Sequence, residues 1–265
     1  MTDTWTPVPV PKLSPSSMLT FRNCPQQFKF DKIDKRPRKG SPESVGGSFV
    51  HEVLEYLFKE PAADRTLEKA KELSAHLWDT SVNKYSRKTW PQQAKEAGVV
   101  DVSKFKWLAW WNIEEYFKME DPTQIEPFGL ETWVEGPVVG DIEVRGIIDR
   151  LVLDDDGNII VQDYKTGKPH NPRYDEDKIF PLMIYAELAS EEHQKPVSKM
   201  ELLYLKDGSR REYEPTPENR ENMYRIVTET HADMTEACNT GIFTTNKTKL
   251  CDWCDHKVVC PAWSK

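Results

Sequence analysis

The feature that most constrains this chain is the stretch IEVRGIIDRLVLDDDGNIIVQDYKTGK, where acidic residues stand inside two runs of apolar residues. The runs 142–153 and 159–165 are short, rich in branched residues and separated by an Asp-Gly turn, which predicts two paired strands. An ionised carboxylate left unpaired in an apolar sheet costs several kcal/mol, so Asp149 and Asp163 each need a cation, hydrogen-bond donors or a metal ion.

Whether these two carboxylates share one site depends on the loop between the strands. Side chains alternate between the faces of a strand, so Asp163 and Lys165 lie on one face of the second strand. In an antiparallel pair the residue numbers of opposed residues have a constant sum, and Asp149 shares that face only if the sum is even. A two-residue turn gives an odd sum, whereas a three-residue loop, a five-residue loop or a bulge gives an even one. A shared site therefore predicts an odd-numbered loop or a bulge.

Two carboxylates beside a lysine are suited to phosphodiester hydrolysis. Carboxylate oxygens bind Mg²⁺ or Mn²⁺, the cation lowers the pKa of a bound water, and a lysine adds positive charge where negative charge develops on phosphate. For any one of these residues alone, a half-buried hairpin with solvent-facing aspartates and an edge lysine is the simpler interpretation. The combination favours a metal-dependent site.

Asp149 followed by Asp163-Tyr164-Lys165 resembles the signature of the PD-(D/E)XK nuclease superfamily. The RecB-type branch adds a Gly-His helix upstream, to which Gly47 to His51 are similar. It also has a Gln-x-x-x-Tyr helix after the lysine strand, of which this chain keeps the tyrosine and has proline in place of the glutamine.

The resemblance implies a role for each matching residue. The metal ligands would be His51, Asp149, Asp163 and the carbonyl of Tyr164. Lys165 would orient or activate water and stabilise developing charge, with Asp149 and Asp163 completing the catalytic set, and Tyr185 would contact DNA. Glu131, on the strand expected before Asp149, is a further candidate ligand that we place behind the others.

Three of the five cysteines form a C-x2-C-x5-C array near the end of the chain, at Cys251, Cys254 and Cys260. A fourth ligand could be the nearby His256, giving a zinc site, or the distant Cys24. Closing the array with Cys24 would join the two ends of the chain. It would reduce the conformational entropy of the unfolded chain, which is worth roughly 5 kcal/mol of stability. Iron and zinc both bind thiolates, so the sequence leaves the metal open.

Cys24 and Cys260 are both followed by proline, as the last ligand of iron-sulfur runs often is. An early cysteine and a late array also resemble the RecB-type nucleases that carry a [4Fe-4S] cluster, including CRISPR-associated exonucleases and AddB-like nuclease domains. This resemblance implies a cluster held by Cys24, Cys251, Cys254 and Cys260. Cys238 is then left over, and we expect it to be a small core residue.

The resemblance implies an α/β core of restriction-endonuclease type, a mixed central sheet flanked by helices with an iron-sulfur staple between the chain's ends. Further strands are expected at 130–134 and 200–206, and helices at about 179–189, with Pro181 in its first turn, and at about 217–239. Gly46-Gly47-Ser48 should open a helix. Trp107 and Trp111 should lie on the apolar face of another helix, where they pack in the core or line a cleft, which we favour over base stacking.

The chain of 265 residues, 38% of them hydrophobic, is long enough for one substantial core. We divide it into an extended arm over 1–15 and a single nuclease domain over 16–265. Within that domain, 62–120 form a helical insertion and 240–265 the C-terminal cysteine segment. No apolar run approaches the roughly 18 residues of a membrane span, and the N-terminus lacks a secretory signal, which predicts a cytoplasmic protein with no membrane partner.

The net charge of -8 at first argues against a nucleic-acid partner. The charge is uneven, however, because residues 22–39 hold seven basic side chains against two acidic ones. Lys168 and Arg173 follow the lysine strand with no acidic residue between Tyr164 and Tyr174, so we expect them to meet a phosphate backbone.

We therefore predict an Mg²⁺- or Mn²⁺-dependent deoxyribonuclease, an exonuclease acting on single-stranded DNA or DNA ends. By resemblance, its protein partners would belong to recombination, repair or CRISPR adaptation. The alternative is a catalytically silent DNA-binding or assembly module with a structural iron-sulfur or zinc site, against which the intact acidic residues and lysine argue.

Overall fold

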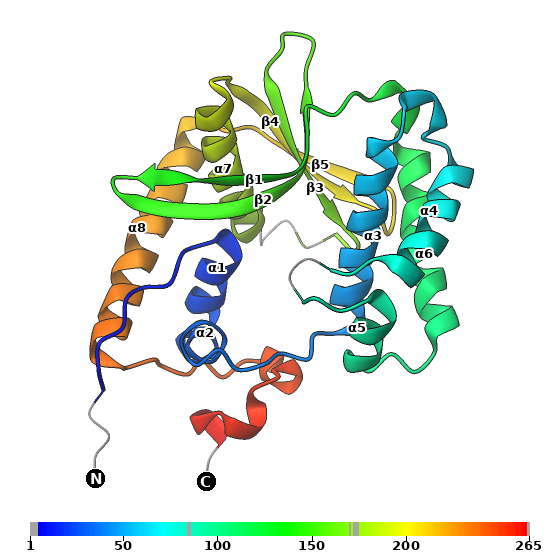
Figure 1. Ribbon diagram of the computed structural model, residues 1–265. Helices are drawn as coiled ribbons and strands as arrows, with labels where there is room; N and C mark the ends of the chain where they lie inside the picture. The colour runs from blue at the N-terminus through cyan, green and yellow to red at the C-terminus, as the bar shows by residue number, and fades with distance from the viewer. Residues whose placement is uncertain (1–4, 84–85, 170, 172–174, 264–265) are drawn as a thin grey trace.

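The protein is an α/β structure built on a mixed sheet, as the sequence predicts (Figure 1). The computed structural model describes residues 5–83, 86–169, 171 and 175–263. Within these ranges five strands pair in the order β1-β2-β3-β4-β5, and only the β3–β4 pair is parallel. The strands are β1 Gly129–Val139, β2 Ile142–Leu153, β3 Ile159–Lys165, β4 Val197–Tyr204 and β5 Ser209–Tyr213.

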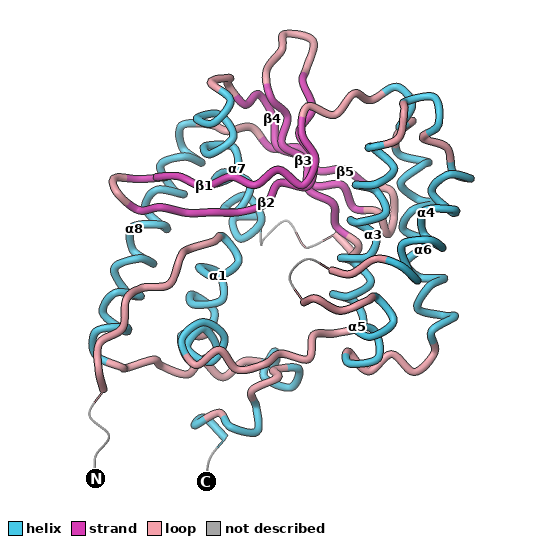
Figure 2. Tube along the Cα trace, in the orientation of Figure 1, coloured by secondary structure: helices cyan, strands magenta, loops and turns pink. Residues whose placement is uncertain are grey.

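Helices cover both faces of the sheet (Figure 2). The α-helices are α1 Pro15–Asn23, α2 Pro25–Phe28, α3 Pro42–Lys59, α4 Leu67–Thr80, α5 Trp90–Glu96, α6 Val102–Met119, α7 Asp175–His193 and α8 Pro217–Thr240. One core packs α1, α7 and α8 on the sheet, and a second core packs α3 to α6. Leu202 belongs to the first core and Leu203 to the second, as the alternation of side chains along a strand requires.

The loop between β2 and β3 has the odd length that a shared carboxylate site requires. The last pair of the ladder is Leu153 with Ile159, which leaves five loop residues, and Arg150 pairs with Gln162. The side chain of Asp154 accepts hydrogen bonds from the backbone N–H groups of Asp156 and Asn158 and so closes the loop. The prediction of an even register sum is confirmed.

Two helix boundaries differ from those expected. Helix α7 begins at Asp175, so Pro181 lies in its interior instead of its first turn. An interior proline removes one helical hydrogen bond, but the burial of Phe180, Leu182, Met183 and Ile184 in the core stabilises the helix around it. Helix α3 begins at Pro42, before the glycine pair, because Ser41 and Ser44 form a capping box there.

The expectation for the tryptophans of α6 is wrong. The buried face of this helix is made by Phe105, Ala109, Ile113 and Tyr116. These positions recur at helical spacing, which leaves Trp107 and Trp111 on the opposite side with 55% and 40% of their surfaces exposed. Apolar side chains occur on both sides of α6, so the sequence did not show which side faces the core.

The first helices lie beside the end of the chain, at the same end of the molecule (Figure 1). The backbone N–H of Gln26 donates to the carbonyl of Thr244 at 3.0 Å, and the Asn246 side chain donates to the carbonyl of Asn23 at 2.9 Å. Helix α1 ends at Asn23, just before Cys24, and α2 begins at Pro25, as the sequence predicts. Across the described ranges, no helix combines the length and apolar character needed to cross a membrane.

A fully buried arginine links the sheet to the α3–α6 layer. The Arg150 guanidinium donates to Tyr116 Oη at 2.8 Å, to Glu120 Oε2 at 2.6 Å and to Gln162 Oε1 at 2.5 Å. It also lies 4.7 Å from the ring centroid of Phe58. Charged side chains are rarely buried without such partners, so this network is a fixed part of the fold next to Asp149.

Arg150→Leu should therefore lower the free energy of unfolding by about 3–5 kcal/mol, because it leaves the buried Oε1 of Gln162 and Oε2 of Glu120 without their donor, although Arg210 still donates to Oε1 of Glu120. Urea unfolding measures the change. The control is Arg225→Leu on α8, which removes an exposed pair with Glu229 and should cost less than about 1 kcal/mol. Equal, small losses in both variants would contradict the role given to Arg150.

Candidate metal and catalytic site

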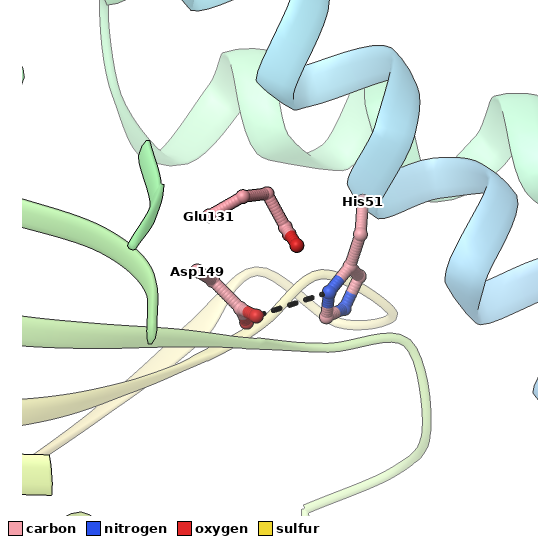
Figure 3. Close-up of side chains that lie close together, drawn as sticks. All are labelled: His51, Glu131 and Asp149. Carbon is pink, nitrogen blue, oxygen red and sulfur yellow. Dashed lines mark ion pairs between the residues drawn. The ribbon is translucent and has the colours of Figure 1, made fainter. Parts of the chain in front are cut away.

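The carboxylate of Asp149 lies at the centre of the candidate site. Its Oδ2 accepts a hydrogen bond from the backbone N–H of Tyr164 at 2.8 Å, which ties β2 to β3. Its Oδ1 lies 3.3 Å from Nδ1 of His51 on α3 (Figure 3). Although partial burial works against the charged form, these contacts and the nearby Lys165 lower the pKa of Asp149, so the carboxylate is ionised.

Helix α3 brings His51 to the sheet by a close approach at a glycine. A Cβ atom added at Gly47 would lie 2.8 Å from Oγ1 of Thr166, so a larger side chain would push the helix away. One turn further on, Nε2 of His51 lies 3.1 Å from the carbonyl oxygen of Tyr164. The Gly-His pattern therefore has a structural reason in this chain.

Both ring nitrogens of His51 face acceptors, which favours the doubly protonated imidazolium. Burial disfavours this charged form, but the charge and hydrogen bond of Asp149, with smaller effects from Asp163 and Glu131, raise the pKa of His51 to about 9. An incoming metal ion would have to displace this proton, because only the neutral imidazole can coordinate.

Glu131 completes a group of three potential ligands. Ligand atoms of His51, Glu131 and Asp149 all lie within 4.8 Å of one another, and no other such group occurs among the described residues. Glu131 lies between the paired positions Leu130–Arg150 and Thr132–Ile148, and therefore opposite Asp149. Its φ of 43° is left-handed, a strained conformation for a residue other than glycine that is often found at functional sites.

Asp163 and Lys165 form an ion pair beside this group. Burial and the negative charge of Asp149 raise the pKa of Asp163 against the opposing effect of Lys165. Burial works against the ammonium of Lys165, but Asp163 outweighs it and raises the pKa of the lysine. Lys165 is therefore a fixed positive charge in the site. Asp163 lies opposite Asp149 in the β2–β3 register, but its carboxylate oxygens are not within 4.8 Å of the ligand atoms of all three residues.

The three clustered ligands open into a cleft of about 570 Å³ between the sheet and helices α3 and α4. Its walls include Ser48, Glu52, Tyr56, His76, Glu131 and Asp149. Oxygen donors with one imidazole suit a hard divalent cation such as Mg²⁺ or Mn²⁺. The group could thus hold a metal ion at the wall of a solvent-accessible cleft.

Comparison with known proteins identifies the family of this chain. The family model described as "PD-(D/E)XK nuclease superfamily" matches residues 12–261. The chain belongs to this superfamily. The nuclease is 28% identical to the "Gene 69 protein" of Mycobacterium phage D29 in an alignment 196 residues long, and the match covers 68% of this chain and 70% of the phage protein.

The fold is also similar to that of a solved structure. A protein from Eubacterium rectale, described as a "putative exonuclease", matches 92% of this chain and 87% of its own length with a TM-score of 0.55. The sequence identity is 11%, so this likeness shows a shared fold. Together with the family match, it confirms the predicted mixed α/β core of restriction-endonuclease type.

Two of the three residues expected to contact DNA lie in the described part of the chain. Tyr185 on α7 packs against Gly146, where an added Cβ would lie 2.4 Å from its ring. Burial, together with the charges of Asp163, Asp149 and Glu131, raises the pKa of Tyr185, so its hydroxyl keeps its proton. Lys168 is exposed after β3. Arg173 lies outside the described residues.

The four cysteines expected to bind a cluster line one cavity together. They are Cys24, Cys251, Cys254 and Cys260. No three of their sulfur atoms lie within 4.8 Å of one another. His256 is buried, and its Nε2 is 2.8 Å from Oδ1 of Asp31, so this ring nitrogen already has a partner. Cys238 is buried in the first core, as expected.

The raised pKa of His51 predicts how the stability of the metal-free protein depends on pH. The folded-state pKa of about 9 exceeds the ordinary 6.5, so the stabilisation by His51 is complete below pH 6.5 and is lost as the pH rises through 9. With chelator present, His51→Gln should therefore lower Tm by several degrees more at pH 6 than at pH 9.5. In an Asp149→Asn background this difference should shrink, and an unchanged difference would contradict the pairing.

Proposed function

We propose that this nuclease is a divalent-cation-dependent exonuclease that cleaves single-stranded DNA or exposed DNA ends. The observation that carries the proposal is the convergence of His51, Glu131 and Asp149 on one point of a cleft, beside the Asp163–Lys165 pair. A structural ion pair, whether in the core or on the surface, requires two charged groups. Three potential metal ligands at the wall of a cleft are more than such a pair requires.

The residues that would hold Mg²⁺ or Mn²⁺ are His51, Glu131, Asp149, Asp163 and the carbonyl of Tyr164. The cation would supply a water of lowered pKa and neutralise charge on the phosphate. The sequence ranked Glu131 behind the other candidate ligands, and its place in the cluster of ligand atoms supports its inclusion.

The chain's own groups have separate roles in this proposal. Asp149 orients the His51 ring through Nδ1 and fixes β3 through the N–H of Tyr164. Asp163 holds the ammonium of Lys165 next to the acidic cluster. There the ammonium can orient the attacking water by hydrogen bonding and stabilise the negative charge that develops on the phosphate oxygens. Tyr185, Lys168 and Arg173 are proposed to contact the DNA.

Lys165→Ala should reduce cleavage of end-labelled single-stranded DNA in Mn²⁺ by about 100-fold or more, because it removes the positive charge nearest the reacting phosphate. Lys168→Ala, a change of the same kind outside the acidic cluster, should chiefly weaken DNA binding. A circular single strand should resist the wild-type enzyme if cleavage requires an end.

Equal activity of wild type and Lys165→Ala would contradict the proposed catalytic site and favour a DNA-binding or assembly module without catalysis. Rapid cleavage of the circular strand would instead show that the enzyme is an endonuclease, because a circle has no end.

We further propose that Cys24, Cys251, Cys254 and Cys260 hold a [4Fe-4S] cluster, as in the RecB-type nucleases and AddB-like domains that this chain resembles. Their shared cavity supports the choice of Cys24 as the fourth ligand.

The anaerobically purified protein should be brown, contain about four irons per chain and lose its colour in the Cys24→Ala variant. The loss should lower Tm as well, because the cluster would tie α1 and α2 to the C-terminal segment. Cys238→Ala is the matched control and should keep its iron. One zinc per chain, or iron retained in Cys24→Ala, would contradict the assignment.

A cytoplasmic location and protein partners in recombination, repair or CRISPR adaptation remain predictions from the sequence, as does the division into arm, helical insertion and cysteine segment.

A further inference from the structure

A second groove runs into the catalytic cleft from the cysteine segment. It has a volume of about 550 Å³ and lies between the start of α3, helix α5 and the C-terminal segment. Ser48, one turn before His51 on α3, lines both this groove and the catalytic cleft. The two hollows therefore adjoin at Ser48, and a chain lying in the groove would be led toward the cleft that holds the candidate metal site.

The groove offers positive charge to an incoming phosphate. Arg38, Lys39 and Lys88 line it, against the acidic Glu96 and Asp255. Lys88 pairs with Glu96, and Arg38 lies 3.4 Å from Asp31 and 3.8 Å from Asp255. Lys39 adds a further positive charge to the same wall.

The N-terminus of α3 also faces this groove. Ser41 and Ser44, which form its capping box, are both lining residues. The capping box already uses the N–H of Ser44 and Pro42 has none, so this end favours an anion mainly through the helix dipole. The helix end and the basic side chains thus act on the same space, at the mouth that leads to His51.

The opposite wall carries an aromatic side chain with no core role. Trp253 lines the groove and is 79% exposed. It stands between Cys251 and Cys254, in a segment whose position is fixed by contacts with residues near Cys24. An exposed aromatic ring beside phosphate-binding charges is the usual arrangement of a single-strand site, because every base can stack on it.

We propose that this groove carries a single-stranded stretch of the substrate into the cleft, with one base stacked on Trp253 and phosphates near Lys39 and the start of α3. The inference rests on the proposed function and names the substrate form that the site accepts. It also gives the cysteine segment a second role, since this segment holds the stacking residue in place.

Trp253→Ala should raise KM for single-stranded DNA about 10- to 100-fold, the effect of removing one stacked base, with a smaller change in kcat. Trp253→Phe should recover most of the affinity. Trp107→Ala is the matched control, because that tryptophan is also exposed but lies on α6, outside the groove. Iron content and Tm, measured for each variant, show whether the cysteine segment stays folded.

A second variant tests the groove without touching the cysteine segment. Lys39→Gln should reduce the slope of log Kd for single-stranded DNA against log salt by about 0.7, the value for one lost phosphate contact on a single strand. Binding is measured by fluorescence anisotropy in Ca²⁺, which is intended to limit cleavage. Lys118→Gln on α6 should leave the slope unchanged.

The outcomes separate this inference from the proposed function. Absence of metal-dependent cleavage by the wild type would reject the proposed function itself. If the wild type cleaves DNA but Trp253→Ala and Lys39→Gln behave like their controls, the groove does not bind single-stranded DNA. The proposed function would then stand without it. An equal rise in KM for blunt duplex DNA would also overturn the single-strand assignment.

Discussion

The carboxylate of Asp149 is the contact on which the rest of the site depends. One oxygen holds the backbone of β3 at Tyr164 and the other holds His51, so a single side chain fixes β2, β3 and α3 relative to one another. Burying this charge is costly without such partners. The neighbouring Arg150 is buried on its own network of hydrogen bonds, so two charged side chains of β2 in succession are held by specific partners.

Much of this arrangement could be predicted from the sequence, because strand geometry is strict. An even register sum was required for Asp149 to face Asp163, and the five-residue loop provides it. Glu131 was underrated because its place opposite Asp149 depends on the β1–β2 register and on a left-handed backbone at that residue. Neither can be deduced from an apolar pattern.

The remaining errors concern positions where packing outweighs local preference. Pro181 lies inside α7 because its neighbours are buried against the sheet, and α3 continues through Gly47 because the helix must approach Thr166 closely. Strand β5 is polar and pairs at the edge of the sheet, so no apolar run indicated it. Tertiary contacts decided each of these cases.

The central claim is that His51, Glu131 and Asp149 together bind a divalent cation that the nuclease uses. Titration with Mn²⁺, followed by electron paramagnetic resonance of the unbound ion, tests this claim without reference to DNA. The account predicts that the wild type removes Mn²⁺ from solution and that Asp149→Asn and Glu131→Gln each weaken this binding at least tenfold. Unchanged binding in both variants would contradict it and place the metal elsewhere in the protein.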